Sequence, residues 1–364
     1  MKKLPLGIQN FKEIIEENHV YVDKTMYIHQ LISNGKCFFL LDDYANICGV
    51  PVDDLELYFE DHIKNVSVSG NFAPNTDLRA GILFWYDGYS WDSKTKLLNP
   101  YGLLSFFFAK VFKSFWYVSG SPKFLIDLIK AKPSSIHELD NLRIYESTLD
   151  ATDIKNLEIG SLLFQTGYLT VSKIVPSIIE TGIPPAYILE MPNFEVKNAF
   201  FRQLTAAFTG KDHIFTENTY TQMQEALRKG DLQSVLKLLR SLFSSIPHQL
   251  HVNREAYYHS IFFAVMNVLG FKTDAEVSVS KGRIDAVLEL KDKVYVFEFK
   301  HVNCPPEADD DEKRKISGKA LELGMQQICA RGYANKYIGC KKTIYLAAFA
   351  FLGRDNIEML LNII

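Results

Sequence analysis

The pattern of apolar positions divides the chain into a long, mostly helical part and a shorter part with strand-like alternation. Helical spacing predicts helices over about residues 26–32, 53–63, 195–250 and 255–269, and one that begins at Asn99–Pro100. Shorter apolar runs predict strands at 37–41 and 187–189, and residues 162–170 predict a helix that ends at Gly167 and passes into a strand. Asp231, after the Gly230 break, is a good N-cap for a new helix. We expect three segments: 1–40, a mainly helical 41–250, and 251–364.

Strand alternation is clearest in residues 283–300, which predict a β-hairpin. Residues 283–290 form one strand, 294–300 form the other, and 291–293 contain the turn. Pairing Lys291 with Val294 gives one face that is apolar throughout, as a buried sheet face requires. That face carries Ile284, Ala286, Leu288, Leu290, Tyr295, Phe297 and Phe299. The opposite face carries Asp285, Val287, Glu298 and Lys300, with Asp285 across from Lys300.

The polar residues of this second face are suited to metal-dependent chemistry. The carboxylates of Asp285 and Glu298, with the backbone carbonyl of Phe299, form an oxygen-rich site of the kind that Mg²⁺ or Mn²⁺ prefers. A lysine beside them, Lys300, can orient an attacking water and partly neutralise a charged phosphate. A lone Glu-x-Lys is more often a solvated surface pair. The flanking aromatic residues and the matched Gly282–Asp285 strand favour the functional interpretation.

Two further helices hold candidate polar residues. Glu255 opens the helix over 255–269 and could point into the metal site, although an acid in a first turn also suits the helix dipole. A long helix is expected from Ser317 to about Tyr337, and the charged stretch from Cys304 to Lys315 is expected to be a loop. On that helix Gln327, Arg331 and Tyr333 could reach a phosphate. From the residues alone, exposed polar side chains without a catalytic role are the favoured interpretation of all three.

Composition limits the possible partners. The 364 residues are 47% hydrophobic and 23% charged, which is typical of a folded soluble protein. The net charge of −3 argues against attachment to nucleic acid by bulk charge alone, but not against an enzyme that contacts a few phosphates. No apolar run approaches the ~18 residues of a membrane span, so we expect a cytoplasmic protein. The five cysteines include no Cys-x-x-Cys pair, so neither a zinc site nor a disulfide framework is indicated.

The order of these motifs resembles the PD-(D/E)XK nuclease superfamily. Glu255 comes first, followed by Gly282-Arg-Ile-Asp285, Phe297-Glu-Phe-Lys300 and Gln327. The resemblance implies a restriction-endonuclease-like mixed α/β sheet flanked by helices. It also implies Asp285 and Glu298 as metal ligands, Lys300 as the catalytic lysine, and Glu255 and Gln327 as supporting groups.

The front of the chain is similar to bacterial proteins that join an AAA-ATPase-like region to such a nuclease. The segments that carry this similarity are Leu4–Phe11, Tyr21–Thr25, Tyr44–Gly49, Tyr86–Tyr89, Asn99–Pro100, Thr166–Leu169 and Pro192–Val196. One departure is large: Lys36–Leu40 leads directly into Leu41-Asp-Asp-Tyr44, where the family continues into a phosphate loop. No Gly-x-x-x-x-Gly-Lys-Ser/Thr occurs in the sequence. We interpret this as deletion of the ATPase core and expect neither ATP binding nor ATP hydrolysis.

The leading hypothesis is a Mg²⁺-dependent nuclease that acts on DNA in preference to RNA, with residues 41–250 as a scaffold. The alternative is a catalytically inactive remnant that binds nucleic acid or assembles with other proteins. Loss of the ATPase core would expose its former contacts, which would favour a homo-oligomer.

Overall fold

A computed structural model of the protein divides the chain into two compact units. One unit comprises Met1–Pro122 and Glu138–Ala199, and the other Lys123–His137 and Phe200–Ile364. The residues described are 1–8, 10–26, 48–116, 126, 139, 141–145, 159–178, 182–211, 213–244, 254–274, 285–302, 308–332, 334–339, 341–352 and 356–364. The helix expected over 26–32 lies outside these ranges except for residue 26, and the strand expected over 37–41 lies entirely outside them. No helix within them is long and apolar enough to cross a membrane.

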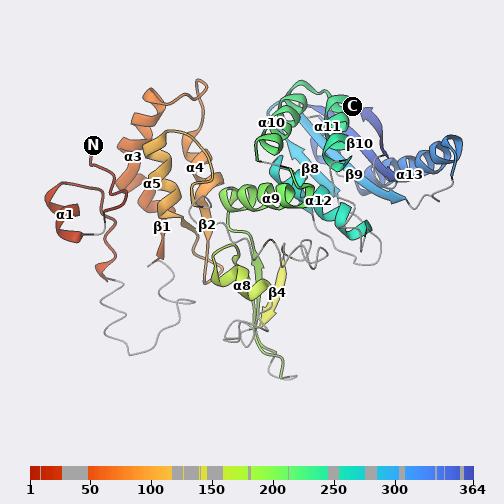
Figure 1. Cartoon of the computed structure of the whole chain (residues 1–364). Helices are drawn as coiled ribbons and strands as arrows, with labels where there is room; N and C mark the ends of the chain where they lie inside the picture. Colours follow the sequence, from red (N-terminus) through yellow and green to blue (C-terminus); the bar gives the residue numbers. More distant parts are fainter. Residues whose placement is uncertain are drawn as a thin grey trace. The chain divides into compact units, whose positions relative to one another are not determined.

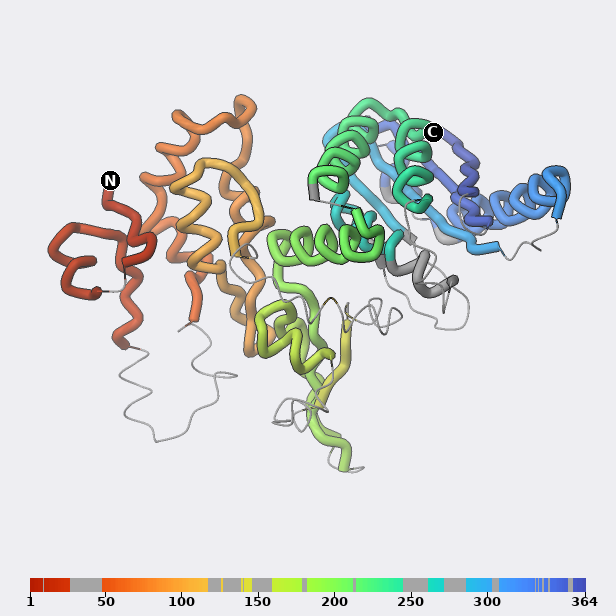
Figure 2. The backbone as a smooth tube through the Cα atoms, in the orientation of Figure 1, coloured from red at the N-terminus to blue at the C-terminus, as the bar shows by residue number. Residues whose placement is uncertain are grey.

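Three helices form the core of the first unit: α3 (Val52–Ser69), α4 (Leu78–Tyr86) and α5 (Pro100–Ala109) (Figures 1 and 2). A shorter helix, α1 (Phe11–Glu16), precedes them. Helix α3 confirms the helix expected over 53–63 and extends it by about two turns. Helix α5 begins where expected, because the Asn99 side chain accepts the backbone N–H groups of Tyr101 and Gly102. The three helices meet through an aromatic core in which Phe59 stacks on Phe107 with ring centroids 5.5 Å apart.

Two small antiparallel sheets complete the first unit as far as it is described. One has the order β1 (Val50–Pro51), β3 (Leu97–Leu98), β2 (Asp87–Tyr89). The other has the order β4 (Leu142–Tyr145), β6 (Ala186–Glu190), β5 (Thr170–Val175). Helix α8 (Ile159–Gln165) leads into β5 through Gly167, whose φ of +80° is readily adopted by glycine. This confirms the helix–glycine–strand transition expected over 162–170.

A buried glutamate, Glu195, connects separate segments of the first unit. It lies in the first turn of α9 (Phe194–Thr209) and is 0% exposed. Its Oε1 accepts the backbone N–H groups of Phe115 and Trp116, at 2.6 and 2.8 Å. Its Oε2 is buried without a hydrogen-bond partner among the described atoms, 2.7 Å from where a Cβ on Gly102 would lie. Burial raises the pKa of Glu195 to about 7, although the two N–H groups act in the opposite direction.

In the second unit a run of helices precedes the sheet along the chain, and one more α-helix lies between two of its strands. Helix α9, which crosses from the first unit into the second, α10 (His213–Lys229) and α11 (Leu232–Ser244) confirm the helical structure expected over 195–250 as far as Ser244, and residues 245–250 lie outside the described ranges. The break falls at Gly230, and Asp231 is the N-cap, since its Oδ1 accepts the N–H of Ser234 at 3.0 Å. Helix α12 (Arg254–Val268) then agrees with the helix expected over 255–269.

The sheet of the second unit is mixed, with five strands in the described residues in the order β11-β10-β9-β8-β7. Only β9 and β10 are parallel, and the other neighbouring pairs are antiparallel. The strands are β7 (Lys272–Asp274), β8 (Asp285–Glu289), β9 (Lys293–Val302), β10 (Thr343–Leu352) and β11 (Asn356–Ile363). A short 3₁₀ helix, η6 (Asn335–Tyr337), precedes β10. The expected fold class was a mixed C-terminal sheet that follows a mainly helical N-terminal region in the sequence, and it is therefore confirmed.

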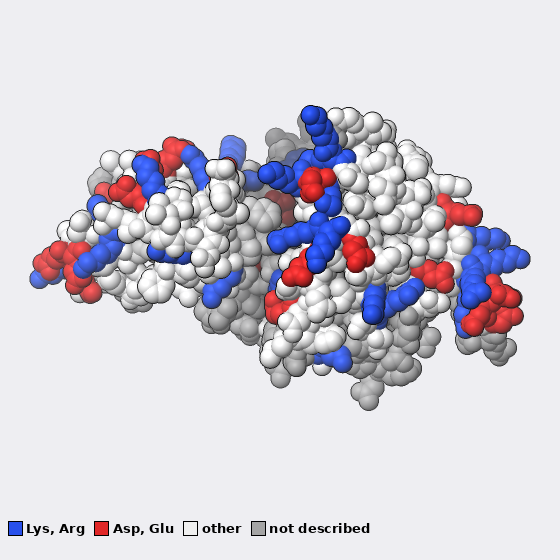
Figure 3. Space-filling view, turned by 90° about the horizontal axis from the view of Figure 1, so that it is seen from above, with Lys and Arg blue, Asp and Glu red and all other residues white. Residues whose placement is uncertain are grey.

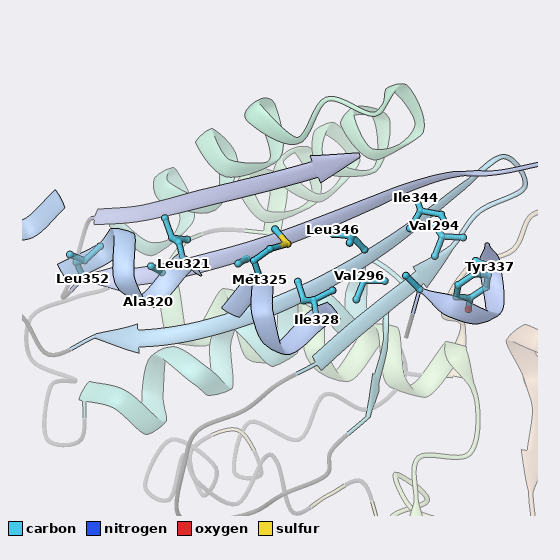
Figure 4. Close-up of a cluster of buried hydrophobic side chains, with 13 residues drawn as sticks. Val294, Val296, Ala320, Leu321, Met325, Ile328, Tyr337, Ile344, Leu346 and Leu352 are labelled. Carbon is cyan, nitrogen blue, oxygen red and sulfur yellow. The ribbon is translucent and has the colours of Figure 1, made fainter. Parts of the chain in front are cut away.

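Helices cover both faces of this sheet (Figure 1). On one face, Phe262 of α12 lies against Phe299, with ring centroids 3.6 Å apart, and Phe271 lies against Phe297 at 4.7 Å. The other face carries Val294 and Val296 of β9, and α13 (Asp310–Arg331) packs onto it through Ala320, Leu321, Met325 and Ile328 (Figure 4). Alternate residues of β9 are therefore buried against different helices.

Helix α13 begins earlier and ends earlier than the sequence indicated. The helix was expected from Ser317, but Asp309 is its N-cap and accepts the N–H of Glu312. Residues 309–315, expected to be part of a charged loop, are therefore mostly helical. The acids at 309–312 favour this start because they stand at the positive end of the helix dipole. Gly332, with φ +63°, ends the helix.

Candidate active site

The hairpin of β8 and β9 sets the geometry of the candidate site. Its faces are as expected: Ala286 and Leu288 are buried on the aromatic side, and Val287 packs on the α13 side. The register differs by two residues, because Asp285 pairs with Glu298 and not with Lys300. The cause is the turn, which holds only Lys291 and Asp292 and is closed by the Leu290 N–H on the Lys293 carbonyl at 2.8 Å. A shift of two residues preserves the faces, so the same polar residues stay on the same side.

Glu298 and Lys300 of β9 and Gln327 of α13 form one polar group where the helix meets the strand. Glu298 is 1% exposed, and the Lys300 side chain is 16% exposed. Lys300 Nζ lies 2.7 Å from Glu298 Oε1 and also donates to Gln327 Oε1. The carboxylate of Glu298 is buried and the ammonium of Lys300 is partly buried, so both lose hydration, and their contact offsets part of that cost. Because Gln327 adds a second acceptor, the amine is held by partners from both the strand and the helix.

Gly324 allows α13 to lie this close to the sheet. A Cβ at this position would lie 3.0 Å from Ala348 Cβ, 3.6 Å from Glu298 Cγ and 3.7 Å from Lys300 Cγ. Gln327 follows three residues later, which puts it on the same side of the helix. Gly324 belongs to none of the sequence motifs of the candidate site. A glycine inside a helical pattern was the available signal, since such a residue costs helix stability and often has a packing reason.

The other candidate residues are placed only in part. The register sets Asp285 directly across from Glu298, and opposed residues of an antiparallel pair share one face. Glu255 lies in the first turn of α12, the helix that packs on the aromatic face. Arg331 is the last residue of α13. The side chains of these three residues, and all of Tyr333, lie outside the described part of the structure.

The donor chemistry of this group fits a hard divalent cation. Lys300 contacts one oxygen of Glu298, and a carboxylate has further lone pairs for other partners. The register sets a second acidic residue, Asp285, opposite Glu298, so this part of the hairpin carries two acids and one lysine. No group of three or more metal-ligating side chains occurs among those described, which leaves out Glu255 and Asp285. Cys48 and Cys329 are free, and the other three cysteines lie outside the described ranges.

Charge on the visible surface is mixed in sign. Figure 3 shows basic and acidic side chains interspersed on the face seen from above. At the start of α13, Lys313 and Arg314 pair with Asp310 and Asp311, at 3.9 and 3.8 Å. Such exposed pairs contribute little to stability, but they reduce the local positive potential. On this face no broad basic surface holds nucleic acid by charge alone, in agreement with the net charge of −3.

Comparison with protein families supports both parts of the resemblance. Residues 253–359 match the model of the PD-(D/E)XK nuclease superfamily, a range that contains α12, α13, strands β7 to β10 and the first half of β11. Residues 5–62 match a family model described as a predicted AAA-ATPase. These matches confirm the assignment made from the motifs, in which an AAA-ATPase-like segment is followed in the sequence by a region of the nuclease superfamily.

A relative comes from Azotobacter chroococcum mcd 1, where it is described as an uncharacterized protein in the vnfD 5′ region. It is 30% identical over 318 residues, which are 86% of this chain and 55% of the relative. The chain thus spans about half the length of the curated relative that it matches. No solved structure matches the chain.

Proposed function

We propose that the C-terminal region, residues 251–364, hydrolyses phosphodiester bonds of nucleic acid, with DNA as the preferred substrate, in a reaction that depends on Mg²⁺ or Mn²⁺. The observation that carries the proposal is the group formed by the buried Glu298 and the part-buried Lys300 and Gln327, with Asp285 across the strand from Glu298. An ion pair of this kind often stabilises a fold no better than an apolar pair of similar volume. Stability alone is therefore a weak explanation for it. Its presence inside a match to a nuclease superfamily favours a catalytic role.

Each residue of the group has a role in this proposal. Asp285, Glu298 and the backbone carbonyl of Phe299 would hold a divalent cation, and Glu255 of α12 would support them. Lys300 orients the attacking water and partly neutralises the phosphate in the transition state. Gln327 keeps the lysine amine in place by accepting one of its protons in a hydrogen bond. A bound divalent cation would supply a coordinated water of lowered pKa and a positive charge beside the phosphate oxygens.

The activity is proposed to be independent of ATP. The sequence contains no phosphate loop, so it offers no backbone cradle and lysine for nucleotide phosphates. Residues 1–40 and the mainly helical segment 41–250 then serve as a scaffold for the nuclease region. The protein is cytoplasmic in this proposal. It forms a homo-oligomer through surfaces that would have contacted the missing ATPase core. The competing proposal is an inactive binding or assembly protein, and the missing phosphate loop is the observation that favours it.

The test is cleavage of labelled single- and double-stranded DNA and RNA in Mg²⁺, Mn²⁺ or EDTA, with and without ATP. Lys300→Ala should lower the rate by roughly 100- to 1000-fold, as expected for loss of one charge-stabilising group. Lys342→Ala is the matched control, because Lys342 also contacts a glutamate, Glu289, at 2.6 Å, but away from the candidate site. Folded wild-type protein that cleaves none of these substrates would favour the binding-protein alternative.

A further inference from the structure

The outer edge of β11 is an unusually regular strand edge. Strand β11 pairs with β10 over eight consecutive residues, Asn356 to Ile363, without a bulge. Helices α11 and α13 both contact it, so its two faces are covered. Beyond it, no further strand is paired in the described part of the chain. Such an edge presents a row of backbone donors and acceptors to a pairing strand.

The hydrogen bonds identify which residues face outward. Ile344 and Ile364 exchange both of their backbone hydrogen bonds, at 3.0 and 2.9 Å. In an antiparallel pair the direction alternates from residue to residue, so the backbone groups of the odd-numbered residues of β11 point away from β10. These residues are Ile357, Met359, Leu361 and Ile363. An independent contact agrees, because the Ile357 carbonyl accepts a hydrogen bond from Arg240 Nε at 2.7 Å.

Apart from Arg240 at the Ile357 end, the strand itself lacks the features by which proteins usually prevent strand pairing. Lysine, proline and bulges are typical protections, and residues 356–364 contain no Lys, Arg, Pro or Gly. Glu358 is the one charged residue of this segment, and it is engaged by Ser317 of α13 at 2.5 Å. The last residues are apolar and open, with Ile363 59% and Ile364 61% exposed.

We propose that β11 pairs antiparallel with β11 of a second copy of this chain, joining the two sheets into one across a two-fold axis. A pairing centred on Leu360 sets Met359 opposite Leu361 near its centre and Ile357 opposite Ile363 at its ends, where the partner's Ile363 N–H would share or replace Arg240 as the donor to the Ile357 carbonyl. The same register sets Glu358 opposite Asn362, which avoids a repulsive pair of like charges. A two-fold interface requires this self-complementarity, and the edge provides it. The inference does not depend on nuclease activity.

The test is the mass of the full chain in solution, by light scattering or sedimentation equilibrium. The wild type should give twice 41.6 kDa at high concentration. Leu361→Pro should give the single-chain mass, because proline removes an outward N–H while breaking no bond to β10. Leu361→Ala keeps that N–H and should remain a dimer, with at most a several-fold weaker association.

Hydrogen exchange of the wild type supplies a readout that needs no variant. The amides of Met359 and Leu361 should be protected in the dimer and exchange rapidly when dilution separates the copies. Those of Leu360 and Asn362, which pair with β10, should stay protected in both states. A wild type that is monomeric at its highest soluble concentration would overturn the proposal. So would a folded Leu361→Pro that keeps the double mass.

Discussion

Replacing Glu195 with glutamine should remove a large part of the pH dependence of stability in the first unit. The pKa of Glu195 is raised from 4.5 to about 7 in the folded chain. At ~1.36 kcal/mol for each unit, the shift corresponds to about 3 kcal/mol. Because the folded pKa is the higher one, this contribution is present in full below pH 4.5. It is lost as the pH rises towards and through 7, when a buried charge must form.

Glutamine keeps the geometry while it removes the titration. Its side-chain carbonyl can still accept the N–H groups of Phe115 and Trp116, which now bond to Oε1. The wild type should therefore lose about 3 kcal/mol more unfolding free energy than Glu195→Gln between about pH 5 and pH 8. Glu56→Gln is the control, since Glu56 is exposed and pairs with Arg79 at the surface. Its pH profile should follow the wild type.

Urea unfolding followed by tryptophan fluorescence measures this change selectively. All three tryptophans, Trp85, Trp91 and Trp116, belong to the first unit, and Trp116 is hydrogen-bonded to Glu195 itself. At each pH, the urea midpoint multiplied by the slope m gives the free energy of unfolding. Parallel pH profiles for the wild type and Glu195→Gln would refute the reasoning, because they would mean that Glu195 does not titrate in this range.

Three other substitutions test the packing around the candidate site. Gly318→Ala should stabilise α13 by roughly 1 kcal/mol without loss of cleavage, because nothing lies within 4 Å of the added Cβ. Gly324→Ala gains the same helix propensity but must displace the helix from Ala348. Cleavage should fall by roughly 10- to 100-fold while the chain stays folded, and equal activity of the two variants would contradict this. Phe262→Ala should cost about 3–5 kcal/mol by circular dichroism in urea. The exposed Leu323→Ala should change stability by no more than about 0.5 kcal/mol.

The faces of the central hairpin could be predicted because side chains alternate strictly along a strand. A register error of two residues preserves this alternation, so Glu298 and Lys300 were assigned to the correct face although Asp285 was paired with the wrong residue. The register itself depends on the turn. Lys291 and Asp292 form a two-residue turn without the Asn-Gly or Asp-Gly signal that would have identified it.

Other features depend on tertiary contacts that no local pattern carries. In the sequence, Glu195 resembles an ordinary acid in the first turn of a helix. Only the fold brings the N–H groups of Phe115 and Trp116 to its carboxylate. The acidic run at 309–312 is equally compatible with a solvated loop and a helix start, and the structure selects the helix. Gly324 acquires its importance only because Ala348 and Glu298 lie beneath it.

The central claim, metal-dependent cleavage at the Glu298 site, is tested most directly by comparing Glu298→Gln with Glu289→Gln on labelled DNA in Mg²⁺ and in EDTA. Both glutamates lie in the same hairpin and contact a lysine, but Glu298 is 1% exposed and Glu289 lies at the surface. We predict that wild type and Glu289→Gln cleave in Mg²⁺ and stop in EDTA, while folded Glu298→Gln is slower by roughly 1000-fold, or ~4 kcal/mol of transition-state stabilisation. Equal cleavage by the two variants, or cleavage that persists in EDTA, would contradict the account.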